Sequence, residues 1–135
     1  MSDNDDLADE LAAFLGTIPS LVSVIPIART IRSPGGLPLL VESITVFSTG
    51  GTIRYSLVGV DMASDVLPWE GITWALADDL GTEYQTQGGG GGGGETIMTM
   101  HADFHPAPPA DATSLLLSMG AEVIPIDLTR AVAAT

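Results

Sequence analysis

Cysteine is absent from the 135-residue sequence. Its absence excludes disulfides, thiolate nucleophiles, cysteine-ligated zinc and iron–sulfur clusters. Lysine is absent too, and the four arginines are outnumbered by 17 acidic residues, which gives a formal net charge of −13. A charge of this sign repels phosphate backbones, so we expect no nucleic acid among the partners.

Long hydrophobic runs are missing as well. The longest mostly apolar stretch, Ile18–Ile31, is too short to span a bilayer and is interrupted by Pro19, Pro26 and Arg29. The N-terminal residues 1–10 carry acidic side chains and no basic one, whereas a signal peptide needs a positively charged start. We therefore expect a cytoplasmic protein without membrane insertion.

A short acidic segment opens the chain. Within residues 1–17, Leu7, Leu11, Phe14 and Leu15 recur at the spacing of one face of an α-helix. The acidic residues that precede this stripe favour a helix start, because negative charge is stabilised at the positive end of the helix dipole. We predict an amphipathic helix whose apolar stripe packs on this domain or on another chain.

Residues 21–128 are predicted to form one antiparallel β-sandwich of seven or eight strands. Apolar residues are 45% of the chain and charged residues 16%, which argues for a folded domain. From Leu21 onward apolar and polar residues alternate and turn residues recur, as in consecutive short strands. The expected elements are a strand within 21–31, a hairpin around 49–51, a second hairpin around 78–81, and strands at 98–104, 114–119 and 122–128. The tail at 129–135 is expected to be loose.

Seven consecutive glycines, residues 88–94, interrupt the alternation. No side chain is available there to specify a regular element, so we predict a loop. A phosphate-binding loop is excluded, because no lysine exists to follow the glycines and Glu95 places a negative charge beside them. The loop is expected to serve as a flexible linker or as a bare strip of backbone that another subunit approaches closely.

Two short motifs carry a resemblance to a known class of domains. Residues Asp78–Tyr84 match the pattern D-x-x-G-x-x-Y, and Phe104–Pro108 match F-x-P-x-P before a further strand. Together, over roughly residues 39–128, they resemble small bacterial, actinobacterial-type immunoglobulin-like β-sandwich domains of unassigned function, some of which carry a glycine-rich insertion. The resemblance implies an immunoglobulin-like fold and assigns no activity.

One strand presents candidate metal ligands. His101, Asp103 and His105 lie on the same face of the predicted strand, and this trio of side chains suits a transition metal. Neighbouring same-face residues of a flat strand lie roughly 6.5–7 Å apart, which is wide for ligands of one ion. The alternative is that the three residues form the polar, solvent-facing side of the strand.

The acidic turns offer a second candidate site. A calcium ion would find hard oxygen ligands there, although no EF-hand spacing is present. The residues concerned are Asp78, Asp79 and Glu83 in one turn, and Asp61, Asp65 and Glu70 in a neighbouring loop. Acids in turns are more often solvated or accept hydrogen bonds from the local backbone, and this is the favoured interpretation.

The two tryptophans receive different assignments. Trp74 alternates with apolar neighbours and is expected in the core. Trp69 lies in a loop, where an aromatic side chain either anchors an interface or caps the end of its own sandwich. Because the sequence contains no recognisable nucleophile with its base, we expect no enzyme and no cofactor. The favoured function is a non-enzymatic interaction or structural module that binds another protein or itself through the N-terminal helix, a sheet edge or the glycine loop. The alternative is a metal- or small-ligand-binding domain.

Overall fold

The computed structural model describes residues 20–60, 69–93, 96–130 and 132–133. In this part of the chain nine strands and one turn of 3-10 helix form. They are β1 (Leu21–Arg32), β2 (Pro38–Phe47), β3 (Gly50–Val58), β4 (Ala75–Asp78), β5 (Gln85–Gly93), β6 (Ile97–His105), β7 (Ser114–Met119), β8 (Glu122–Asp127), η1 (Leu128–Arg130) and β9 (Val132–Ala133). The predicted all-β class is confirmed.

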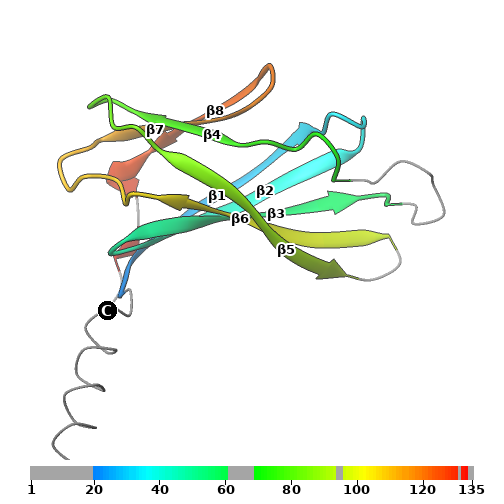
Figure 1. Ribbon diagram of the computed structural model, residues 1–135, viewed down its shortest axis with the longest axis horizontal. Coiled ribbons are helices and arrows are strands. Elements are labelled where there is room, and N and C mark those ends of the chain that lie inside the picture. The colour runs from blue at the N-terminus through cyan, green and yellow to red at the C-terminus, as the bar shows by residue number, and fades with distance from the viewer. Residues whose placement is uncertain (1–19, 61–68, 94–95, 131, 134–135) are drawn as a thin grey trace, which may run out of the picture.

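The strands form two antiparallel sheets stacked as layers (Figure 1). The larger sheet has the order β5-β6-β3-β2-β1-β9, and the smaller has the order β4-β7-β8. Alternate residues of the central strands point between the layers and form the core, as the period of two predicted. The largest fully buried side chains are Leu39, Val41, Ile44, Ile53, Leu57, Leu115, Leu117 and Ile124.

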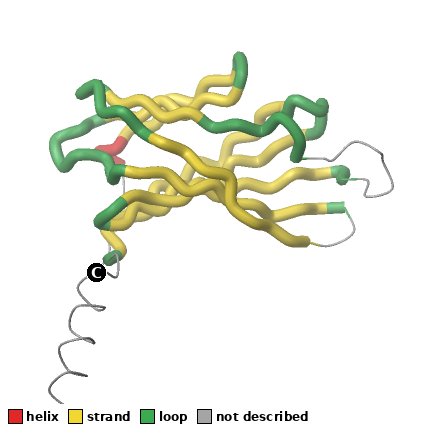
Figure 2. The backbone as a smooth tube through the Cα atoms, viewed as in Figure 1, coloured by secondary structure: helices red, strands yellow, loops and turns green. Residues whose placement is uncertain are grey.

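The chain passes from one sheet to the other between β3 and β4, between β4 and β5, between β6 and β7, and between β8 and β9. The loops from β4 to β5 and from β6 to β7 lie at the same end of the layers (Figure 2). Asp79 joins them, because its carboxylate accepts hydrogen bonds from the Thr113 N–H at 3.0 Å and the Thr113 hydroxyl at 2.8 Å. The end of β4 is thereby held beside the start of β7.

The first predicted hairpin is confirmed. Strands β2 and β3 pair antiparallel, with Ile44 opposite Ile53. The two glycines assigned to its turn, Gly50 and Gly51, instead begin β3. A Cβ atom on Gly50 would collide with the main chain of Phe104, and one on Gly51 with the Phe104 ring. Glycine is needed here for close packing rather than for the turn.

The second predicted hairpin is wrong in its pairing. A turn does form after Asp78, but β4 pairs with β7 and β5 pairs with β6. The two strands that flank the turn therefore belong to different sheets. Local alternation identifies a strand, whereas its partner is decided by contacts far away in the sequence, here those of Asp79 with the start of β7.

The predicted glycine loop is a strand. Gly88–Gly93 continue β5 and pair antiparallel with β6, with Gly88 opposite Ala102 and Gly93 opposite Met98. The register is irregular between Gly88 and Gly91. The ladder hydrogen bonds are made by main-chain groups, so β6 can act as the template for a strand without side chains.

The predictions for the C-terminal part of the chain are confirmed in part. Strands β7 and β8 confirm the two predicted C-terminal strands, and Pro125 lies on an edge strand, where its missing N–H costs no ladder bond. The expected loose tail is wrong at Val132–Ala133, which pair with Ser23 and Val24 of β1.

The predicted N-terminal helix lies outside the described residues. In the ranges that the structure covers, no helix is long and apolar enough to cross a membrane.

The strand assignment of the glycines predicts unequal effects of two neighbouring substitutions. A Cβ atom on Gly91 would lie 2.6 Å from the Thr99 carbonyl oxygen, whereas one on Gly90 would meet no atom within 4 Å. We expect Gly91→Ala to lower the free energy of unfolding by about 1–3 kcal/mol. Gly90→Ala should change it by less than about 1 kcal/mol, since alanine also restricts the unfolded chain. Urea unfolding measures both, and equal losses would contradict the pairing with β6.

Candidate functional site

Strand β5 forms one edge of the larger sheet. It pairs with β6 on one side, and no strand of the described residues pairs with its other side. Its sequence, QTQGGGGGG, contains no proline and no charged residue. Edge strands in proteins are usually protected by such residues, because their free N–H and C=O groups can pair with another chain. Strand β5 contains neither kind of protecting residue.

A hollow lies beside the glycines of β5. Trp69, Met98 and Met100 line it together with Gly89–Gly91, and its volume is about 270 Å³. The hollow exists because three consecutive residues of the strand have no side chain to fill it. Trp69 itself is partly buried and packs against the core. The residue predicted as an interface anchor therefore lies over the unprotected strand.

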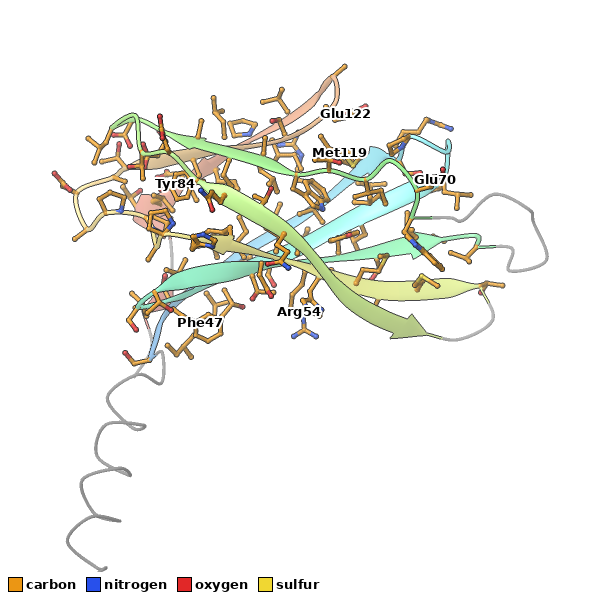
Figure 3. The ribbon with its side chains drawn as sticks, in the orientation of Figure 1. Phe47, Arg54, Glu70, Tyr84, Met119 and Glu122 are labelled. Atoms are coloured by element: carbon orange, nitrogen blue, oxygen red, sulfur yellow. The ribbon has the colours of Figure 1, made fainter. Side chains whose placement is uncertain are left out.

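Charge is unevenly distributed around this edge. Neither β5 nor the turn before it, Asp78–Tyr84, contains a basic residue. Arg29 and Arg32 lie on β1, which β6, β3 and β2 separate from β5. Arg54 of β3 projects from the face of the larger sheet that is turned away from the smaller sheet (Figure 3). The β5 side of the sheet therefore combines an unprotected edge with acidic neighbours.

His101, Asp103 and His105 lie on the outer side of β6, while Met100, Ala102 and Phe104 point into the core. Two of the predicted ligands form hydrogen bonds with residues of neighbouring strands. The Asp103 Oδ1 atom accepts a hydrogen bond from the Thr52 hydroxyl at 2.9 Å, and His105 Nε2 lies 3.0 Å from the Gln85 Oε1 atom. No group of three His, Cys, Asp or Glu side chains suited to a metal ion occurs in the part of the chain that the structure describes. The geometry thus gives the metal hypothesis no support.

The D-x-x-G-x-x-Y motif forms a turn held by one carboxylate. Asp78 Oδ1 accepts hydrogen bonds from the N–H groups of Leu80 at 2.9 Å and Thr82 at 3.0 Å, and Asp78 Oδ2 accepts one from the Tyr84 hydroxyl at 2.7 Å. Gly81 has a φ of 79°, a conformation in which a Cβ atom would be strained. The motif therefore forms a turn that is stabilised by hydrogen bonds within it, and β5 begins directly after it.

The pKa values reflect these hydrogen bonds. Desolvation acts to raise the pKa of Asp78, but hydrogen bonds from Thr82, Tyr84 and Leu80 outweigh it and lower the pKa to about 2. Desolvation and the neighbouring carboxylate both raise the pKa of Tyr84. Hydrogen bonds from Thr113 lower the pKa of Asp79.

Two of the candidate calcium ligands are engaged in hydrogen bonds within the protein. The carboxylates of Asp78 and Asp79 accept hydrogen bonds from donors of the protein itself. Glu70 lies apart from the turn that precedes Tyr84, toward the other end of the layers (Figure 3). Asp61 and Asp65 lie outside the described residues. The interpretation of these acids as acceptors of local backbone hydrogen bonds is therefore confirmed for Asp78. Asp79 instead accepts hydrogen bonds from Thr113 and Ser114, which are distant in the sequence.

Comparison with models of known protein families, with curated proteins and with solved structures finds no match. The candidate site therefore rests on geometry alone. Sequence reasoning named a sheet edge and Trp69 separately but did not place them together. The signal that could have joined them was the alternating pattern on both sides of the glycines, which is typical of two paired strands.

The carboxylate of Asp78 predicts a pH-dependent stability. Its pKa of about 2 in the folded chain lies below the usual value of 3.8, so its stabilising effect is present above about pH 4 and is lost as the pH falls towards 2. We expect Asp78→Asn to lower the free energy of unfolding by about 1–2 kcal/mol at pH 7, with a difference from the native chain that shrinks below pH 4. Thermal unfolding across this pH range measures the effect. Asp111→Asn, at an exposed position, is the control. An equal loss of unfolding free energy in both variants would refute the role of the turn.

Proposed function

We propose that the protein is a non-enzymatic interaction module that binds an extended segment of another protein along the free edge of β5. The observation that carries the proposal is a nine-residue edge strand without charge or proline. An added strand gains main-chain hydrogen bonds from such an edge, as in other cases of β-strand addition. Six of the nine residues are glycines, so the incoming backbone meets no side chain there.

The charge of the molecule favours a basic partner. The chain carries a net charge of −13, and the turn that precedes β5 is acidic. Two copies of the chain would repel each other, whereas a segment rich in arginine or lysine would be attracted and correctly oriented. We therefore assign the edge to a basic segment of another protein rather than to a second copy.

The hollow under Trp69 supplies a second element of recognition. Side chains of an added strand alternate between its two faces, so those on one face would lie towards Trp69 and Met98. A volume of about 270 Å³ is sufficient for one large apolar side chain. The proposed ligand is thus an extended segment in which basic residues alternate with at least one apolar residue.

We further propose that the fold is immunoglobulin-like. If β2 to β8 are lettered A to G, the larger sheet contains the order A-B-E-D and the smaller sheet contains C-F-G. This is the strand order of constant-type immunoglobulin domains, and β1 and β9 then extend the larger sheet beyond strand A. The N-terminal helix with Leu7, Leu11, Phe14 and Leu15 stays a prediction from the sequence pattern, as a second contact surface.

The edge proposal is tested with a peptide of about eight residues in which arginine and valine alternate. We expect saturable chemical-shift changes in the amides of Gly88–Gly93. The double variant Gly90→Lys/Gly92→Lys should weaken binding about ten-fold or more, because lysines on an edge strand oppose pairing. A Cβ atom at either position meets no atom within 4 Å, so the variant should fold.

The control variant adds the same charge elsewhere. Leu116→Lys/Val123→Lys alters two residues of the smaller sheet, on β7 and β8, that are about half exposed. Its affinity for the peptide should equal that of the native chain. Equal weakening in both variants would reduce the effect to net charge and refute the edge site. A dimer detected by light scattering, and abolished only by the edge variant, would assign the edge to a second copy instead.

A further inference from the structure

The sandwich is open on the side opposite to β5, between β1 and β8. These two strands belong to different sheets, and they contact each other across the layers without pairing. Strand β9 pairs with β1 only at Ser23 and Val24. From Ile25 to Arg32 the outer edge of β1 therefore has no partner strand in the part of the chain that the structure describes.

Two hollows follow one another along this opening. The first has a volume of about 350 Å³, and its lining includes Ile27 and Arg29 of β1 and Asp127 of β8. The second, also of about 350 Å³, includes Ile31 and Arg32 of β1 and Glu122 of β8 in its lining. Together we call them the β1–β8 groove. Ile27 and Ile31 pack against the core but stay partly exposed, so the rim of the core is uncovered along the groove.

An added strand does not fit the β1 side of this groove. Pro26 has no N–H group to donate, and the register of β1 is irregular between Pro26 and Arg29. Ala28 has a φ of 52°, which turns the backbone out of the extended form. Such features protect an edge from strand addition. A helix suits the groove better, because its main-chain hydrogen bonds are formed within the helix itself.

The charges along the groove differ between its two sides. Arg29 and Arg32, two of the four arginines in the sequence, line it on the β1 side. Asp127 and Glu122 line it on the β8 side. A complementary helix therefore has an apolar stripe with acidic residues along one flank and no charge along the other.

The sequence before β1 contains this pattern. Residues 1–17 carry five acidic residues and no basic one. At helical spacing, Asp3, Asp6 and Glu10 follow one flank of the predicted apolar stripe. The other flank contains the uncharged residues Ala8 and Ala12. The predicted helix thus matches both the apolar rim and the two charged sides of the groove.

We propose that residues 5–15 dock in the β1–β8 groove of the same chain, with the acidic flank beside Arg29 and Arg32. Eleven helical residues are about 16 Å long, and the strand from Ile25 to Arg32 spans about 23 Å. Residues 16–20 reach at most about 17 Å, whereas Leu21 lies about 13 Å from Ile25 along an extended strand. The connection is therefore long enough for the segment to turn back.

The covalent connection favours the same chain over a second copy. A tethered segment has a high effective concentration at a nearby site, and two copies with a net charge of −13 each repel one another. Docking in this groove uses neither β5 nor the hollow under Trp69, so the inference goes beyond the proposed function.

The proposal is tested with a spin label on the full chain. The sequence contains no cysteine, so Ala12→Cys gives a single attachment point for a nitroxide. We expect the amide signals of Ile27 and Ile126, in the groove, to lose intensity in the proton–nitrogen correlation spectrum. Those of Gly88–Gly93, at the opposite edge, should lose far less. Unchanged intensities in the groove would overturn the proposal.

A mixed sample separates the two sources of the segment. It contains labelled chain without nitrogen-15 and unlabelled chain with nitrogen-15. No loss of intensity is expected in the groove of the nitrogen-15 chain. A loss as large as that in the singly labelled chain would assign the groove to the segment of a second copy and would overturn docking within one chain.

Two variants of the segment test the apolar stripe. Leu11→Asp places a charge on the stripe and should lower the docked population about ten-fold or more, because the apolar contact is lost. Ala13→Asp adds the same charge to the same segment away from the stripe. It should retain the loss of intensity in the groove. Equal behaviour of both variants would refute packing through the stripe.

Two variants of the sandwich test the charges. Arg29→Glu should lower the docked population about two- to five-fold, because it repels the acidic flank. Arg54→Glu, also at an exposed position but on the outer face of the larger sheet, should leave it unchanged. Equal effects would refute the assigned orientation. The variants Leu11→Asp and Ala13→Asp should bind the arginine–valine peptide at β5 equally, so the edge proposal and the groove proposal stand or fall separately.

Discussion

The close approach of β5 to β6 is the contact on which the candidate sites depend. At Gly89 a Cβ atom would collide with the His101 ring, and at Gly91 and Gly93 with carbonyl oxygens of β6. Only glycine allows the two backbones to lie this close. The same lack of side chains leaves the edge without charged residues and the hollow under Trp69 unfilled. One local requirement thus has two consequences at the surface.

The position of β5 is set at its other end by hydrogen bonds. The carboxylate of Asp78 closes the turn and holds the Tyr84 hydroxyl, and the carboxylate of Asp79 binds the start of β7. These contacts send β4 into the smaller sheet and β5 into the larger one. The strands part beyond the turn, and the hydrogen bond from Thr86 to the Trp74 carbonyl spans the separation.

Much of the fold could be predicted from the alternation of side chains. The β2–β3 hairpin, the inward face of β6 and the pair β7–β8 all follow from a period of two, because each strand buries one face. Strand pairing could not be predicted at β4 and β5, since it depends on contacts between residues far apart in the sequence. The strand at 88–93 was not predicted, because glycine has no side chain and a run of glycines shows no alternation of apolar and polar residues. Its structure is imposed by β6.

The candidate sites were predictable only in part. Trp69 was identified from its loop position, and His101, Asp103 and His105 were correctly assigned to one face, but their hydrogen-bond partners on β3 and β5 are not visible in the local sequence.

The run of glycines in β5 affects how the strand tolerates inserted or deleted residues. In most strands an inserted or deleted residue turns every following side chain to the opposite face. Between Gly88 and Gly93 such a change would replace glycine by glycine, and the register irregularity between Gly88 and Gly91 offers a place where an extra residue bulges out of the ladder. The strand should therefore tolerate variation in the length of its glycine tract, a kind of genetic change that repeated codons readily undergo, while the rest of the sandwich keeps its register.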